Sequence, residues 1–150
     1  MLFNAVKFVH ILLAIIAVGF NASYAIWLQR AARAPEHEAF AIRGVKFLDD
    51  RIANPAYGLL LLTGLLMVFL SRIPLTTFWI AAALVLWLIA MVSGLALYTP
   101  ALRRQLEALE ASGSQSEAYR ALDRRSSAYG IAIAVVVLLI LVLMVFKPGA

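Results

Sequence analysis

The fold of this chain is decided by residues 3–28, which read FNAVKFVHILLAIIAVGFNASYAIWL. At about 1.5 Å per residue, a helix of this length spans about 39 Å, enough to cross a hydrocarbon core of about 30 Å with some tilt. One ionisable side chain, His10, lies deep among these apolar residues. Burying an imidazole in a membrane is costly unless it has a polar partner. We therefore expect His10 to face other helices as part of a functional site. The alternatives are a neutral ring bonded to a neighbouring helix and a ring that reaches the interface.

The composition is that of an integral membrane protein. Of the 150 residues, 64% are hydrophobic and 14% are charged, whereas soluble domains are about half apolar. Three further apolar runs, at about residues 55–70, 76–98 and 128–146, predict an all-α fold with four membrane-spanning helices in a single domain. The net charge of +5 falls in loops beside the spans, so we attribute it to topology and anionic lipid, and we exclude nucleic-acid binding. The absence of Cys excludes disulfides and thiolate metal sites.

The basic residues predict the orientation of the spans. Five lie in the loop 29–54, one follows the second span, and five lie in the loop 99–127. Because cytoplasmic loops carry the excess of Lys and Arg, we predict both long loops in the cytoplasm and both termini outside. Apolar residues are interspersed with charges in both loops, which predicts a short amphipathic helix lying on the membrane surface in each.

A short internal repeat relates the two halves of the chain. The sequence LDDR at residues 48–51 matches LDRR at residues 122–125 with an offset of 74. After a two-residue slip, AYG at residues 56–58 matches AYG at residues 128–130. The repeat predicts a tandem duplication of a two-helix unit, and hence an antiparallel four-helix bundle.

Small and polar residues recur on the first span at helical spacing, at His10, Ala14, Ala17, Asn21 and Ala25. These positions form one stripe along a helix. Small side chains let helices approach closely, and polar ones need partners away from lipid. We therefore expect this stripe to face the interior of the bundle.

The outer level of the bundle has a candidate metal or cofactor site. Counting from the ends of the spans, His10 lies about 10 Å into the membrane, and Met67 and Met144 fall at a similar level. Imidazole with thioether ligands suits a haem iron or a copper(I) ion. Methionine also fills gaps in apolar packing, which is the alternative interpretation.

The inner level has a candidate polar cluster made of Asn21, Asn54, Tyr57, Tyr98 and Tyr129. Tyrosine is enriched at membrane interfaces as an anchor. If these residues converge instead, they form a polar vestibule beneath an apolar middle. No predicted span carries an acidic residue, which argues against an open ion pathway.

Several short motifs together resemble a known family: KFVHIL at residues 7–12 followed by Gly19, then NPAYG at 54–58 leading to TG at 63–64. The chain resembles a family of small, uncharacterised four-helix integral proteins of the bacterial inner membrane. It is more distantly similar to copper-resistance D-type membrane proteins and to the J-type protoporphyrinogen oxidase.

The distant similarities carry implications about cofactors. Similarity to the J-type oxidase implies a b-type haem held by His10, together with a Lys in the third span. Span 76–98 contains neither Lys nor His, so oxidase activity is in doubt. Similarity to the copper-resistance proteins implies metal handling at the outer face, at the depth of His10.

We expect the chain to be embedded in the lipid bilayer. Three classes of function are compatible with this sequence. We favour an accessory or structural subunit, either of a larger membrane complex or of a homo-oligomer. The alternatives are a haem- or copper-binding protein that uses His10, and a small transporter. We identify no catalytic residue, because the chain has no phosphate-binding Gly loop, no paired carboxylate within a span and no Ser/His/Asp constellation.

Overall fold

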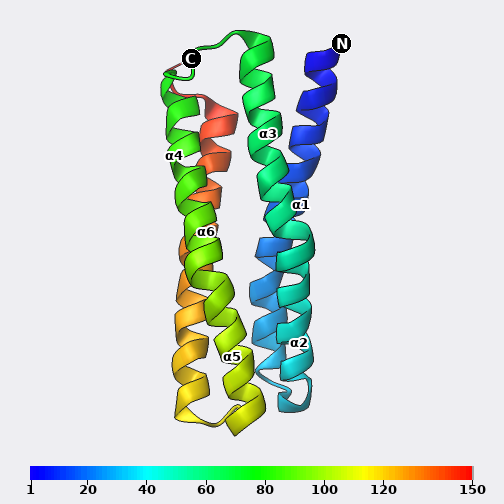
Figure 1. Ribbon diagram of the computed structural model, residues 1–150, viewed down its shortest axis with the longest axis vertical. Helices are drawn as coiled ribbons and strands as arrows, with labels where there is room; N and C mark the ends of the chain where they lie inside the picture. The colour runs from blue at the N-terminus through cyan, green and yellow to red at the C-terminus, as the bar shows by residue number, and fades with distance from the viewer. Residues whose placement is uncertain (150) are drawn as a thin grey trace.

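The computed structural model describes residues 1–149, which are helical apart from short turns (Figure 1). The elements are α1 (Leu2–Ala31), α2 (Pro35–Leu48), η1 (Asp49–Ala53), α3 (Asn54–Ser71), α4 (Phe78–Ser93), η2 (Gly94–Tyr98), α5 (Thr99–Ser112) and α6 (Glu117–Phe146). Because α2, η1 and α3 follow without a break, as do α4, η2 and α5, the described chain forms four continuous rods. Each rod is long and apolar enough to cross a membrane. The prediction of an all-α protein with four spanning helices is confirmed at this level.

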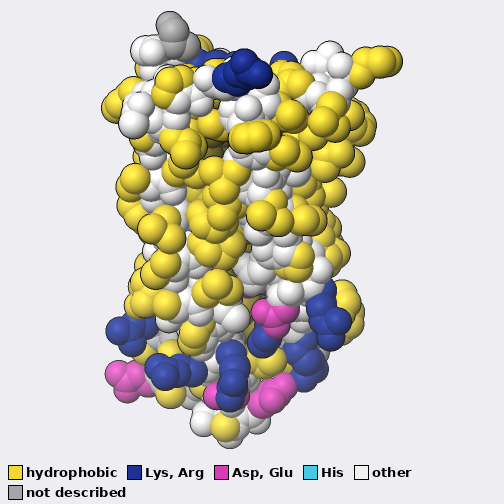
Figure 2. Space-filling model, turned by 45° about the horizontal axis from the view of Figure 1, so that its top comes forward, with side chains coloured by type: hydrophobic (Ala, Val, Ile, Leu, Met, Phe, Trp, Pro, Cys, Tyr) yellow, Lys and Arg dark blue, Asp and Glu magenta, His cyan; other side chains and the backbone are white. Residues whose placement is uncertain are grey.

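The rods pack mainly in two pairs. In the first pair α1 lies against α3 and α2, and in the second pair α6 lies against α4 and α5. Contacts of α2 with α5 and of α1 with α6 join the pairs. Both termini lie at one end of the molecule (Figure 1). Charged side chains gather at the other end, below a broad apolar belt (Figure 2), and we call this the charged end.

The apolar belt is packed like a membrane protein. Large side chains point outward, as Phe8 and Phe69 do with exposed fractions of 67% and 78%. The buried positions of the rods include many alanines: Ala17, Ala53, Ala56, Ala83 and Ala90. Lipid tails are as apolar as leucine, so helices in a bilayer gain most by close approach of small residues. The sequence therefore exposes its large apolar side chains and packs its small ones.

Two π-helical turns let prolines sit inside continuous rods. Pro55 follows η1 and Pro100 follows η2, and in each case the residue before the proline donates its N–H to the carbonyl five residues back. A proline within a regular helix lacks a donor and its ring clashes with the preceding turn. The wider π turn accommodates the ring without ending the helix. The second span was predicted to begin at about residue 55, whereas in the structure the helix continues through Pro55 from α2 and η1.

The two amphipathic helices predicted to lie on the membrane surface are α2 and α5, and their placement differs from that prediction. Each continues a long rod, and the two pack on each other at the charged end. Part of each apolar face is buried by neighbouring helices, with Ile42, Val45 and Leu102 almost fully enclosed, whereas Phe40 and Phe47 stay exposed. Neighbouring helices therefore cover Ile42, Val45 and Leu102, and the place of α2 and α5 relative to a membrane surface stays a prediction.

The fourth rod begins well before its predicted span 128–146. Ser116 caps α6 by accepting a hydrogen bond from the Tyr119 backbone N–H at 3.2 Å. Gly113 ends α5 with a φ of +75°, a conformation that favours glycine. These signals start α6 at Glu117, so polar residues 117–127 form its first turns.

Candidate functional site

His10 faces α3 and not the outside of the bundle. Its Nδ1 lies 2.8 Å from Thr63 Oγ1, and the Thr63 hydroxyl in turn donates to the Leu59 carbonyl at 2.8 Å. Because the Thr63 hydroxyl uses its own proton for Leu59, its oxygen is available to accept a hydrogen bond from His10 Nδ1–H. The ring also lies against Gly64, where an added Cβ would approach His10 Cε1 to 3.3 Å. This contact is part of the seam between α1 and α3.

The other two predicted ligands lie on different helix pairs. Met67 is half-buried on α3 one turn beyond Thr63, while Met144 is half-buried on α6, which packs mainly against α4 and α5. Neither of the two main cavities is lined by His10, Met67 or Met144. Neither of these two cavities therefore offers space for a porphyrin at His10. A shared site of these three residues stays a prediction.

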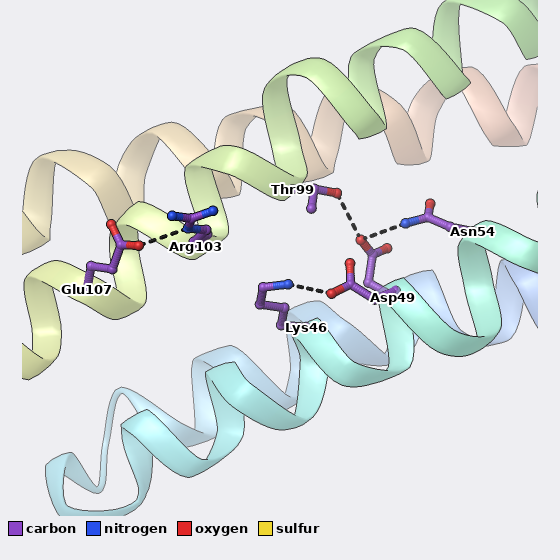
Figure 3. A network of polar contacts seen from close by, with 7 residues as sticks. Lys46, Asp49, Asn54, Thr99, Arg103 and Glu107 are labelled. Atoms are coloured by element: carbon purple, nitrogen blue, oxygen red, sulfur yellow. Dashed lines mark hydrogen bonds and ion pairs between the residues drawn. The ribbon is translucent and has the colours of Figure 1, made fainter.

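A polar layer lies where the rods pass from the apolar belt to the charged end, and its centre is Asp49. This carboxylate is only 6% exposed. Its Oδ2 accepts hydrogen bonds from Asn54 Nδ2 at 3.3 Å and from Thr99 Oγ1 at 3.2 Å (Figure 3). Asp49 and Thr99 belong to the second and third rods, so the bond joins the two helix pairs. We call this group the junction layer, and its members are Asn21, Asp49, Asn54, Tyr57, Trp87, Tyr98 and Thr99.

The first rod and α4 also contribute to the junction layer. Asn21 Nδ2 donates to the Ala17 carbonyl at 3.1 Å and to the Tyr57 hydroxyl at 2.9 Å. Trp87 Nε1 donates to the Tyr57 carbonyl at 3.1 Å. Tyr57 thus receives hydrogen bonds from two different rods, which holds α3 in register with its neighbours.

A small cavity of about 20 Å³ lies within the junction layer, enough for about one water molecule. Four of the five residues predicted to cluster at this level line it: Asn21, Asn54, Tyr57 and Tyr98. The fifth, Tyr129, lines a separate, mainly apolar hollow of about 130 Å³ between α4 and α6. Asp49 and Trp87 also line the small cavity, and the sequence analysis missed both.

The predicted stripe on the first span is partly correct. Ala17 is fully buried and Asn21 is hydrogen-bonded within the junction layer. Ala25, however, is exposed, and the buried residue at this level is Tyr24. The buried face of α1 is thus offset by one residue at this level, where α1 contacts α2 as well as α3.

A second polar network lies inside the charged end. The Tyr119 hydroxyl donates to Glu38 Oε1, and Gln105 Nε2 donates to Asp123 Oδ1 at 2.8 Å. Gln105 Oε1 also accepts from the Ser126 hydroxyl. Glu38, Gln105, Tyr119 and Ser126 are all buried. These hydrogen bonds tie α2, α5 and α6 together. We call the group the stalk network, and its members are Glu38, Gln105, Tyr119, Asp123 and Ser126.

Tyr119 is the donor at the centre of the stalk network. It lies outside the apolar run 128–146, in the first turn of α6. Burial and the hydrogen bond to Glu38 raise the pKa of its hydroxyl above the ordinary value. The hydroxyl therefore stays protonated at neutral pH and donates a hydrogen bond to Glu38.

Surface ion pairs also connect the helices of the charged end, but we expect them to matter little. Arg43 Nη1 lies 2.6 Å from Glu110 Oε1, and both side chains are about half exposed. Exposed pairs contribute about 0–1 kcal/mol. We expect Arg43→Ala to lower the free energy of unfolding by less than about 1 kcal/mol, measured by denaturant titration in detergent micelles. A larger loss would show that this pair is structurally important.

Comparisons with known proteins agree with the membrane character of the chain. A family model described as "Predicted integral membrane protein (DUF2269)" matches residues 4–148. No curated protein and no solved structure matches the chain. Among residues 1–149, no group of three or more His, Cys, Asp or Glu side chains is placed to hold a metal ion.

Proposed function

We propose that this chain, which belongs to the family of predicted integral membrane proteins described as DUF2269, is an accessory or structural subunit of a larger complex in the bacterial inner membrane. The observation that carries the proposal is the length and internal bonding of the charged end. The second and third rods have 37 and 35 residues, which correspond to about 56 and 53 Å of helix. A hydrocarbon core is about 30 Å thick. A substantial part of each rod therefore stands outside the bilayer.

In this proposal the rods form an antiparallel bundle with the charged end in the cytoplasm and both termini outside. The unequal distribution of Lys and Arg supports that orientation, because five such residues lie in each long loop and one lies in the short loop. The spans are then the predicted ones, at about 3–28, 55–70, 76–98 and 128–146. The repeat of LDDR and LDRR supports an origin of the two helix pairs by duplication.

The charged end has the properties of a rigid docking platform. Its interior combines an apolar core with the stalk network, so its helices are held in fixed positions. Its surface includes Phe40 and Phe47 on one face of α2, with exposed fractions of 77% and 61%. Aromatic residues at i and i+7 with basic neighbours are typical of a helix face that packs on a partner. Neither main cavity includes His10, and the cavity in the junction layer is water-sized, which makes a cofactor or transport role less well supported.

The proposal predicts a stable partner and a dispensable His10. We expect the tagged chain, extracted from its own membranes in mild detergent, to co-purify with one assembly in fixed stoichiometry. Phe40→Ser combined with Phe47→Ser should release the partner while the far-UV circular dichroism stays unchanged. His10→Ala should keep the partner, because His10 lies in the opposite end of α1.

Two outcomes would favour the other function classes. A Soret band or bound copper that His10→Ala removes would replace the proposal with a cofactor-binding role. If the protein purifies alone and carries a substrate across vesicle membranes, a transporter role would replace the proposal.

The matched control for the Phe40→Ser and Phe47→Ser variant is Phe69→Ser. It changes an exposed aromatic residue at the other end of the molecule and should leave the partner bound.

A further inference from the structure

The Asp49 carboxylate is buried without a counter-ion from the chain. Among residues 1–149, no Lys or Arg forms an ion pair with it. The nearest lysine along the helix, Lys46, pairs with Asp50 instead. The two donors that reach Asp49 are neutral, and their distances of 3.2 and 3.3 Å are at the long end of the hydrogen-bond range. Burying a carboxylate costs several kcal/mol unless another charge compensates it.

The arrangement around Asp49 has the chemistry of a cation site. Both neutral donors contact Oδ2, and Oδ1 accepts no hydrogen bond from any described residue. Asn21 uses its amide nitrogen for both of its hydrogen bonds, and Asn54 likewise donates through nitrogen, so their side-chain oxygens are free. Asn21, Asp49 and Asn54 all line the water-sized cavity, together with the hydroxyl-bearing Tyr57 and Tyr98.

A second observation points to a missing ligand at this level. Tyr24 is 3% exposed, and its hydroxyl is the one buried polar side-chain atom among residues 1–149 without a hydrogen-bond partner. Tyr24 packs in the same buried cluster as Tyr98 and Ala53, within electrostatic range of the Asp49 carboxylate. Buried hydroxyls are nearly always paired, either with protein or with an ordered water. Tyr24 does not line the water-sized cavity, but its unpaired hydroxyl shows that the polar groups at this level lack a full set of partners.

We propose that the junction layer binds one monovalent cation, with Na⁺ as the best fit, through Asp49 and the side-chain oxygens of Asn21 and Asn54. The oxygen ligands are those of a hard cation. A single carboxylate gives the site one negative charge, which one monovalent ion neutralises. Ca²⁺ takes six to eight oxygens, commonly from several carboxylates, and Mg²⁺ usually keeps several waters. A cavity with space for about one water suits neither.

The other charged and titratable groups near Asp49 come from each helix packed around it. Lys46 forms an ion pair with Asp50 across α2 and η1, and the charges of both also act on Asp49. The remaining groups are the hydroxyls of Tyr24, Tyr57 and Tyr98. The tyrosines are neutral at the pH of the test described next. Among the members of the junction layer, Asp49 is therefore the one carboxylate, and no Lys or Arg of residues 1–149 is in direct contact with it.

The test is thermal unfolding of the purified full chain in detergent, at constant ionic strength and pH 7.5, in NaCl, KCl or choline chloride. We expect the Tm to rise saturably with Na⁺, by about 5–10 °C at one hundred times the Kd. Asp49→Asn should make the Tm independent of Na⁺. The matched control is Asp50→Asn, which neutralises the adjacent, exposed carboxylate and should keep the Na⁺ response.

A direct measurement keeps the test decisive if Asp49→Asn does not fold. We expect the wild-type protein to bind about one ²²Na⁺ per chain, displaced by unlabelled NaCl and not by choline chloride. Equal Tm values in NaCl and choline chloride, or no ²²Na⁺ binding, would overturn the proposal and assign the carboxyl to a proton. Loss of the Na⁺ response in Asp50→Asn would also overturn it, because the ion would then be held at the surface.

Discussion

Tyr119→Phe is expected to lower the free energy of unfolding by about 3–4 kcal/mol, although it removes a single oxygen atom. That oxygen donates the hydrogen bond that Glu38 receives inside the charged end. Glu38 is only 5% exposed, and among residues 1–149 it forms no ion pair. Leaving a buried carboxylate without its donor costs much more than the hydrogen bond itself is worth. Equilibrium unfolding in mixed micelles, followed by far-UV circular dichroism, measures the loss.

A double-mutant cycle separates the orphaned charge from simple loss of packing. We expect the Tyr119→Phe and Glu38→Leu double variant to be more stable than Tyr119→Phe alone, because the buried charge is gone. The effects of the two single substitutions should therefore not add. If Tyr119→Phe costs less than about 1 kcal/mol, as we expect for Arg43→Ala at the surface, then water reaches Glu38 and the stalk network is not closed.

The membrane helices could be predicted from the sequence because their signal depends on composition alone. Residues 3–28 are apolar over more than the thickness of a bilayer, and the structure has α1 at Leu2–Ala31. The end of the fourth rod at Phe146 also agrees with the predicted span. Hydropathy measures the free energy of transferring a segment from water to lipid, and this free energy depends mainly on the segment's own residues. Few contacts with the rest of the chain are needed to specify it.

The charged end could not be predicted in the same way, because its structure depends on contacts between helices. An amphipathic pattern shows that α2 and α5 need a cover for residues such as Ile42 and Leu102, but it does not identify the cover. Pro55 and Pro100 also resembled helix starts, since a π turn that accommodates a proline leaves no clear mark in the sequence. The stalk network depends on the packing of α5 against both α2 and α6. The sequence pattern does not specify that packing, so it did not reveal the network.

Asp49 was missed for a related reason. It stands beside Asp50 in a stretch rich in charges, and adjacent residues of a helix point in different directions. Asp50 faces outward and pairs with Lys46, while Asp49 faces the junction layer. The signal that could have separated them is the repeat, in which Asp49 matches Asp123. Asp123 is also hydrogen-bonded inside the bundle, whereas Arg124 matches Asp50 and is exposed.

The inward direction of His10 could be inferred from the cost of an imidazole in lipid, but its partner could not. Thr63 satisfies its own hydroxyl within α3, so nothing in the sequence marks it as an acceptor. The close contact with Gly64 suggests what the histidine contributes here. The ring fills the space that a missing side chain leaves between α1 and α3, and this interpretation leads to a specific expectation.

Gly64→Leu is expected to lower the free energy of unfolding by about 2–3 kcal/mol. A Cβ at this position would lie 3.3 Å from His10 Cε1, and the rest of a leucine side chain needs more space than a small shift of the ring provides. Overpacking of this kind costs about 1–3 kcal/mol, and the displaced ring also loses its hydrogen bond to Thr63. Unfolding in mixed micelles gives the free energy, and the imidazole proton shifts in NMR spectra report on the ring.

Gly58→Leu is the matched control because Gly58 lies on the same helix and a Cβ there meets nothing within 4 Å. Replacing a helical glycine in open space should be neutral or stabilising by up to about 1 kcal/mol. The combination of Gly64→Leu with His10→Ala should recover much of the lost stability, since the smaller side chain makes room for the leucine. If Gly64→Leu is as harmless as Gly58→Leu, α1 and α3 are not in close contact at His10, and the seam between them must lie elsewhere along the rods.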